Sequence, residues 1–177
     1  MRPRIHFSPL ERALYHTQAR ELEAEILSYW DPVKGVFVPT KNQVEGLDYK
    51  SADIDSQVVL AFLHGGLDNG FLLWDDPRVI STVNKTIETF KNLYTINSDP
   101  SIPGVLIGRY LEDRYGGDNL NEGNGWVLAT LAIAEVYNKM AMTAIKQNQA
   151  TDAATDAATK FSARMTKLRG TRARTRK

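Results

Sequence analysis

Residues 109–137 read RYLEDRYGGDNLNEGNGWVLATLAIAEVY and place a polar cluster directly before an apolar helix. Its charged and aromatic residues are Arg109, Tyr110, Glu112, Asp113 and Tyr115. A loop rich in glycine and asparagine follows, and then Trp126 starts a helix that is apolar on nearly every side, which is typical of a buried helix. Donors, acceptors and flat apolar faces in one place are typical of a small-molecule site and suit a sugar. From the residues alone, the alternative is a surface loop with ion pairs, followed by a core tryptophan.

Two motifs in this stretch point to a known family. The segments Arg109–Tyr115 (RYLEDRY) and Gly123–Thr130 (GNGWVLAT) resemble the Arg-Tyr-Pro-Glu-Asp-x-Tyr and Gly-Asn-Pro-Trp-Phe-Leu-x-Thr motifs of the glucoamylase family of glycoside hydrolases. Leu111 and Gly125 stand where that family has proline. The upstream piece Leu47–Gly65 is similar to the fungal members, and the resemblance covers about residues 5–145.

The resemblance implies a fold and an activity. The expected fold class is all-α, a portion of an (α/α)6 barrel with four to five helices. The implied reaction releases glucose, with inversion and without a cofactor, from the non-reducing ends of 1,4-α-glucans. The implied partners are therefore starch, glycogen or malto-oligosaccharides.

The resemblance also implies binding residues. Arg109 matches the arginine that donates to glucose hydroxyls, and the other expected substrate-binding residues are Glu112, Asp113, Tyr115 and Trp126. For each acid, an alternative stays open: Glu112 or Asp113 pairs with Arg109 and braces the loop. The sequence predicts no metal ligand set, since His6, His16 and His64 lack metal-site spacing.

No catalytic residue is assigned. Inverting glycosidases need one carboxylic acid and one carboxylate base on opposite faces of the sugar. In glucoamylases the acid belongs to a Trp-Glu-Glu motif and the base precedes an Ala-Arg-Asp-Leu-Thr-Trp motif. Neither motif occurs in the 177 residues, so we expect a truncated chain without activity. The alternative function is a non-catalytic helical fragment that binds sugar or a partner.

Apolar periodicity predicts four helices. The first, over 9–30, opens with the capping box Ser8-Pro9-Leu10-Glu11, and Asp31-Pro32 is expected to end it. The others are expected over 53–64, over 77–94 with Asp76 as N-cap, and over 126–148 with Asn124 as N-cap. Residues 34–39 predict a turn with a short extended piece, and 40–52 a loop.

The C-terminal part differs in composition from the rest. We expect one domain over 1–148 and a low-complexity, basic tail over 149–177 that is disordered, although alanine favours continuation of the last helix into it. Residues 160–177 hold eight cations and no acid, so the net charge of +1 leaves −7 for residues 1–159. Eight cations could contact the phosphates of a nucleic acid, but a solvated tail is the favoured interpretation.

Composition excludes some further classes. The chain has no cysteine, so thiol chemistry and disulfides are absent. No apolar run approaches the roughly 20 residues of a membrane span. The first residues, MRPRIHFSP, lack the apolar core of a signal peptide, and the sequence leaves the cellular location unknown.

Overall fold

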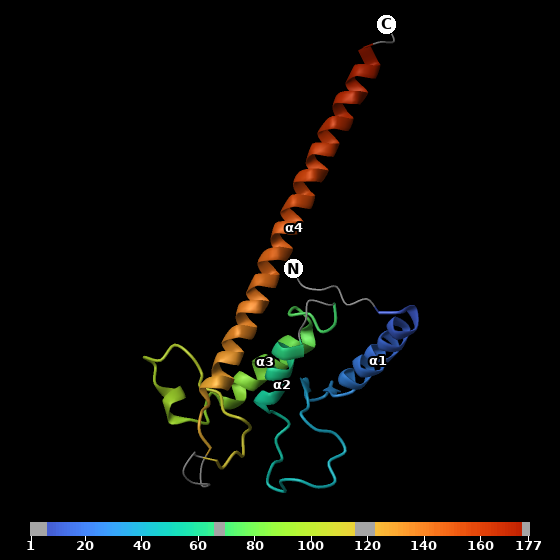
Figure 1. The fold of residues 1–177 in the computed structure, drawn as a ribbon. Coiled ribbons are helices and arrows are strands. Elements are labelled where there is room, and N and C mark those ends of the chain that lie inside the picture. The colour runs from blue at the N-terminus through green and yellow to red at the C-terminus, as the bar shows by residue number, and fades with distance from the viewer. Residues whose placement is uncertain (1–6, 66–69, 116–122, 175–177) are drawn as a thin grey trace, which may run out of the picture. The chain divides into compact units, whose positions relative to one another are not determined.

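The computed structural model describes residues 7–65, 70–115 and 123–174, with side chains of the last segment described as far as Thr151. Two compact units are present, Met1–Val136 and Tyr137–Lys177. Four α-helices are described: α1 (Pro9–Leu27), α2 (Ser56–Gly65), α3 (Pro77–Phe90) and α4 (Val127–Arg174) (Figure 1). The described part also contains strands β1 (Trp30–Asp31) and β2 (Val36–Phe37) and the 3-10 helix η1 (Thr95–Ser98).

The predicted helix starts are confirmed where a local signal sets them. The Ser8 side chain accepts from Glu11 N, and Ser8 N donates to the Glu11 carboxylate, which completes the capping box of α1. Asp76 caps α3 by accepting from Arg78 N. The helix α2 starts later than predicted, at Ser56, because Asp55 pairs with an extended segment instead of extending the helix.

The predicted helix ends are too late in two places. We expected α1 to reach residue 30, but it ends at Leu27, and Trp30 pairs with Phe37 in an antiparallel hairpin. Gly35 at φ +66° and the Asp31 carboxylate, which accepts from two turn amides, form the turn of that hairpin. The helix α3 ends at Phe90, four residues early, since the Asn97 amide takes the Phe90 carbonyl.

The start of α4 differs from the prediction in its cap. Trp126 precedes the helix and its carbonyl accepts the first helical hydrogen bond, from Thr130 N at 3.0 Å, so the N-cap position is Trp126 rather than Asn124. The helical backbone continues past residue 148 to Arg174, as the alanine content suggested. The side chains of 152–177 lie outside the described residues, and disorder of the basic segment stays a prediction.

The core of the first unit forms around α3. Buried apolar side chains come from the hairpin, from α2, α3 and α4, and from the segments before α3 and before α4: Val36, Phe37, Val59, Trp74, Val79, Val83, Phe90, Ile107, Tyr110, Ala129, Ala132, Ile133 and Val136. The hairpin is tied to α3, because Phe37 N donates to the Thr82 hydroxyl at 3.1 Å and the Ser81 hydroxyl donates to the Gly35 carbonyl. In Figure 1, α2 and α3 lie side by side, in agreement with their contacts.

The described residues form four α-helices, within the four to five expected, and add a two-stranded hairpin to the expected all-α class. They show no (α/α)6 barrel, so their place in one stays an expectation from the family resemblance. The buried inner helix that we expected at 126–148 buries one face only: Ala129 and Ile133 are covered, whereas Val127 and Leu131 are 70% and 62% exposed. The apolar residues of α1 are likewise uncovered, and this helix has no buried residue.

Candidate functional site

An extended segment, Ile107–Tyr110, positions the candidate site. Its Arg109 carbonyl accepts from Ser56 N at 2.7 Å, at the start of α2, and Tyr110 forms a bridge with Asp55. At its other end the Ile107 carbonyl accepts from Trp126 N at 2.7 Å. The segment is therefore held between the starts of α2 and α4, and this fixes the backbone from which Arg109 projects.

Arg109 is the centre of the site. Its Nε donates to Asp113 Oδ2 at 2.7 Å, and its terminal Nη2 donates to Asp113 Oδ1. The guanidinium carbon lies 5.4, 5.5 and 5.1 Å from the ring centroids of Tyr110, Tyr115 and Trp126. Four of the five expected binding residues thus meet at one place, because a guanidinium offers both a donor fork and a flat face for aromatic rings.

Asp113 acts as the buried partner of Arg109. Its side chain is 1% exposed, against 34% for that of Arg109, and its Oδ1 also accepts from Tyr115 N at 3.0 Å. Burial by itself would raise the pKa of Asp113, but the hydrogen bonds from Arg109 and from the Tyr115 amide outweigh it and leave the pKa below its ordinary value. The hydrogen bonds that Arg109 donates to Asp113 raise the pKa of Arg109. Asp113, rather than Glu112, is therefore the acid that pairs with Arg109.

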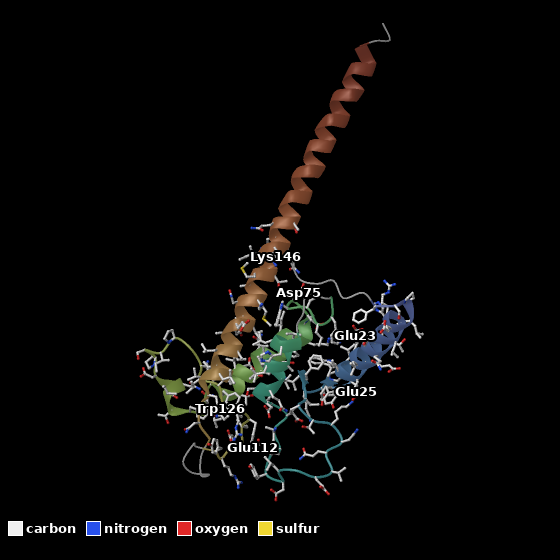
Figure 2. The ribbon with its side chains drawn as sticks, in the orientation of Figure 1. Glu23, Glu25, Asp75, Glu112, Trp126 and Lys146 are labelled. Atoms are coloured by element: carbon white, nitrogen blue, oxygen red, sulfur yellow. The ribbon has the colours of Figure 1, made fainter. Side chains whose placement is uncertain are left out.

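Glu112 has a different partner. Its Oε1 accepts from the Ser51 amide at 3.1 Å and from the Ser51 hydroxyl at 2.7 Å, which ties the motif to a loop 61 residues earlier. Burial favours a higher pKa for Glu112, yet the Ser51 hydrogen bonds lower it below the usual value. Its Oε2 is buried without a hydrogen-bond partner. Figure 2 labels Glu112 and also Trp126, which directly precedes α4.

Further residues that the sequence did not single out for the site border Arg109. Lys50 Nζ lies 2.5 Å from Asp55 Oδ2 and 4.4 Å from the Tyr110 ring centroid. Burial and a hydrogen bond with Tyr49 raise the pKa of Tyr110 to about 12, so this phenol is neutral at pH 7. Lys50 to Asp55 fall within the upstream segment that carries the family resemblance, and that was the only signal in the sequence that could have found them.

A hollow of about 450 Å³ opens beside Arg109. It is lined by aromatic, charged and one aliphatic side chain: Leu47, Tyr49, Arg109, Tyr110, Asp113, Arg114 and Tyr115. Arg114 covers the Tyr49 ring at 4.2 Å. Trp126 contacts Arg109 but is not one of the residues that line the hollow. Phenol rings, a guanidinium and a carboxylate suit a polyhydroxylated ligand.

The two acids of the site are poorly suited to acid–base chemistry. A general acid in a glycosidase needs a raised pKa so that it carries a proton at neutral pH. The pKa values of Glu112 and Asp113 are both lowered, and each carboxylate is occupied by protein donors. In the described ranges, no group of three or more His, Asp or Glu side chains could hold a metal ion, and no helix is long and apolar enough to cross a membrane.

Comparison with known proteins adds a family match over nearly the whole chain. The model of glycosyl hydrolases family 15 matches residues 8–175. At the C-terminal end this match extends past residue 145, where the resemblance of the motifs ends. Similar proteins include Glucoamylase 1 of Rhizopus oryzae, 32% identical over 70% of this chain, and a glucoamylase of Blastobotrys adeninivorans, 29% identical over 67%.

The match covers a small part of each relative. The chain spans 20% of the length of the Rhizopus and Blastobotrys proteins. A probable glucoamylase of Schizosaccharomyces pombe is 29% identical over 75% of this chain and 26% of its own length. No solved structure matches the chain significantly.

Proposed function

Because the chain belongs to glycosyl hydrolases family 15, we propose that its Arg109 site binds the terminal glucose units of 1,4-α-glucans. The reaction it would serve is the glucoamylase reaction, release of glucose from the non-reducing ends of starch, glycogen or malto-oligosaccharides with inversion. The relatives named as glucoamylases support this substrate class. The observation that carries the proposal is the guanidinium held between three aromatic rings at the edge of a polar hollow.

The roles of the five residues follow from their contacts. Arg109 is one-third exposed, so its remaining N–H groups can donate to sugar hydroxyls while Asp113 keeps the fork in place. Tyr115 is 44% exposed and offers a ring face to the C–H groups of a pyranose. We assign Asp113, Glu112 and Trp126 positioning roles, since their contacts are with protein groups.

The hydrolytic step needs more than this site holds. Inversion requires an acid that protonates the leaving oxygen and a base that activates water, about 6.5 to 9.5 Å apart. Glu112 and Asp113 have lowered pKa values, and both accept hydrogen bonds from protein donors, so we place neither in the catalytic pair. This favours the second candidate function, in which the 177 residues on their own bind glucan without hydrolysing it.

Titration of the full chain with maltotriose, followed by calorimetry or by NMR shifts of the Trp126 indole, tests the binding proposal. We expect Arg109→Ala to weaken binding at least about tenfold, because loss of a charge-assisted hydrogen bond is worth about 1.5 to 3 kcal/mol. Arg109→Lys keeps the charge but lacks the fork, so it should recover only part of the affinity.

The matched control is Arg78→Ala. Arg78 also forms a two-point pair with an aspartate, Asp76, but it belongs to α3 and does not line the hollow. It should leave maltotriose binding within twofold of the unchanged chain. Equal affinity of Arg109→Ala and Arg78→Ala, with far-ultraviolet circular dichroism showing both folded, would reject the assignment of the site.

A further inference from the structure

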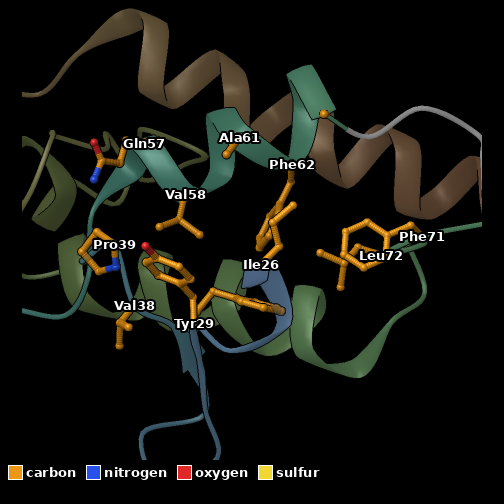
Figure 3. Close-up of a pocket in the computed structure, with 12 residues that line it drawn as sticks. Ile26, Tyr29, Val38, Pro39, Gln57, Val58, Ala61, Phe62, Phe71 and Leu72 are labelled. Carbon is orange, nitrogen blue, oxygen red and sulfur yellow. The ribbon is translucent and has the colours of Figure 1, made fainter. Parts of the chain in front are cut away.

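A second pocket, of about 510 Å³, lies in the same unit and shares no lining residue with the Arg109 hollow. Its walls come from the end of α1, the hairpin, α2 and the segment before α3, and its lining includes Tyr29, Phe37, Gln57, Ala61, Phe62 and Phe71 (Figure 3). A volume of this size falls in the range of roughly 300 to 1,000 Å³ that is typical of small-molecule sites.

Aromatic contacts hold the walls of the pocket in place. The Phe37 ring lies 5.4 Å from Trp30 and 5.7 Å from Phe62, the latter in an edge-to-face arrangement that ties the hairpin to α2. Val38 N donates to the Tyr29 carbonyl at 2.9 Å, which fixes the backbone on either side of the Tyr29 ring. The pocket is therefore formed before any ligand enters, and binding requires little reorganisation.

The chemistry of the lining selects an uncharged ligand. None of the lining side chains carries a charge, and burying a charged group among them would be costly. Outside the lining, Lys41 lies over the Tyr29 ring at 4.6 Å from its centroid, donates to the Ser28 hydroxyl and pairs with Glu25 at 3.4 Å. Its charge is compensated and does not call for an anionic ligand.

Polar groups occur at one end of the pocket in the view of Figure 3. The Gln57 carboxamide and the Tyr29 hydroxyl lie toward the left, whereas Phe71 and Leu72 lie toward the right. The rest of the lining is aliphatic or aromatic. A ligand with a flat apolar body and one hydrogen-bonding group at its end matches this distribution.

We propose that the pocket between α1, the hairpin and α2 binds a neutral aromatic small molecule of two or three rings with a terminal hydrogen-bonding group. Walls on several sides suit a compact molecule better than a protein segment laid along an open face. Phe62, whose ring is partly exposed, offers an aromatic surface to the ligand, and Gln57 supplies both a donor and an acceptor. This site is independent of glucan binding, since the two pockets have no lining residue in common.

The test is a fluorescence titration of the full chain with N-phenyl-1-naphthylamine, a neutral aromatic amine that brightens in apolar surroundings. We expect one saturable site with a dissociation constant of roughly micromolar order, which corresponds to about −8 kcal/mol. Maltotriose at saturating concentration should not displace the probe. More than one equivalent bound, or no saturation, would show that the probe only coats exposed apolar surface and would overturn the proposal.

Two variants and one control test whether the probe binds in this pocket. Ala61 belongs to an exposed position of α2, so Ala61→Phe should fill the pocket without unfolding the chain and weaken binding at least about tenfold. Gln57→Leu removes the terminal hydrogen bond without filling the space and should weaken binding about three- to tenfold. The control, Leu131→Ala, removes an apolar side chain that is 62% exposed on α4 and should change nothing.

Circular dichroism spectra of all three variants show whether each is folded. Folded Ala61→Phe that binds the probe as tightly as the unchanged chain would refute the site, and so would a loss on Leu131→Ala as large as that on Ala61→Phe. If Ala61→Phe does not fold, Gln57→Leu decides in its place: unchanged binding by that variant counts against the proposal.

Discussion

Arg109 and Asp113, four residues apart in a non-helical segment, are joined by two parallel charge-assisted hydrogen bonds, and only the carboxylate is fully buried. Asp113 is therefore the buried, structural member of the pair, and Arg109 keeps N–H donors that can reach a ligand. Three aromatic rings surround the Arg109 guanidinium.

The first prediction concerns the pH dependence of stability. The folded-state pKa of Asp113 is lowered, so its contribution is present above the unfolded pKa of about 3.9 and is lost as the pH falls through the lower folded value. We expect Asp113→Asn to lower the free energy of unfolding by about 1 to 3 kcal/mol at pH 7 and by much less near pH 2. Urea unfolding at both pH values measures this. Glu45→Gln, on an exposed loop, serves as the control, and an equal loss at both pH values would contradict the expectation.

The second prediction concerns Tyr94. Its hydroxyl is buried without a hydrogen-bond partner, and burial followed by the charge of Asp113 raises its pKa to about 12. Since an unsatisfied buried hydroxyl costs free energy, Tyr94→Phe should be neutral or stabilising by up to about 1 kcal/mol. Thermal unfolding measures the change. A destabilisation above about 1 kcal/mol would mean that the hydroxyl has a partner, and Tyr115→Phe controls for the loss of an exposed hydroxyl.

The third prediction concerns Gly108, directly before Arg109. A Cβ at this position would lie 1.9 Å from the Tyr94 hydroxyl oxygen and 3.0 Å from Phe90. We expect Gly108→Ala to destabilise the chain by about 1 to 3 kcal/mol, and Tyr94→Phe in the same chain to restore part of the loss. Gly104→Ala is the matched control, because a Cβ there meets nothing within 4 Å. Additive effects in the double variant would disprove the predicted clash.

The fourth prediction concerns the capping box of α1. This helix has no buried residue, so its stability depends on local interactions more than on packing. Ser8→Ala removes the acceptor for Glu11 N and should cost about 1 kcal/mol of local stability, whereas Ser8→Asn should retain most of it. Amide hydrogen exchange over residues 9–15 measures the difference. Equal protection in both variants would show that the cap contributes little.

The fifth prediction concerns catalysis. The chain made as written should release no glucose from maltose or soluble starch above background, because the family's Trp-Glu-Glu and Ala-Arg-Asp-Leu-Thr-Trp motifs are not in these 177 residues. General acid and base groups contribute about a hundred- to ten-thousand-fold each, and a binding site alone cannot replace them. Turnover that Arg109→Ala abolishes would show that a catalytic pair exists within the chain.

Several features were predictable because neighbouring residues determine them. Ser8 and Asp76 mark the starts of α1 and α3 by side-chain caps that reach only three or two residues along the chain. The family could be identified from two short motifs, and the match over residues 8–175 confirms it. Arg109, Asp113, Tyr115 and Trp126 meet because they belong to those motifs.

Other features depend on contacts between residues that are distant in sequence. The sequence left open which acid pairs with Arg109; the fold directs Glu112 to Ser51, 61 residues earlier, and leaves Asp113 for Arg109. The ends of α1 and α3 likewise depend on a hairpin and on the Asn97 amide rather than on helix propensity.

The exposure of one face of α4 also depends on contacts between residues that are distant in sequence. Its apolar residues indicated burial on all sides, but exposure is decided by what packs against a helix, and Val127 and Leu131 have no cover among the described residues. The sequence by itself thus determined the family, the starts of α1 and α3 and the residues of the Arg109 motif, because these are local patterns. Only the tertiary structure decided the partners of each carboxylate, the helix ends and the second pocket, because each arises from packing between separate segments.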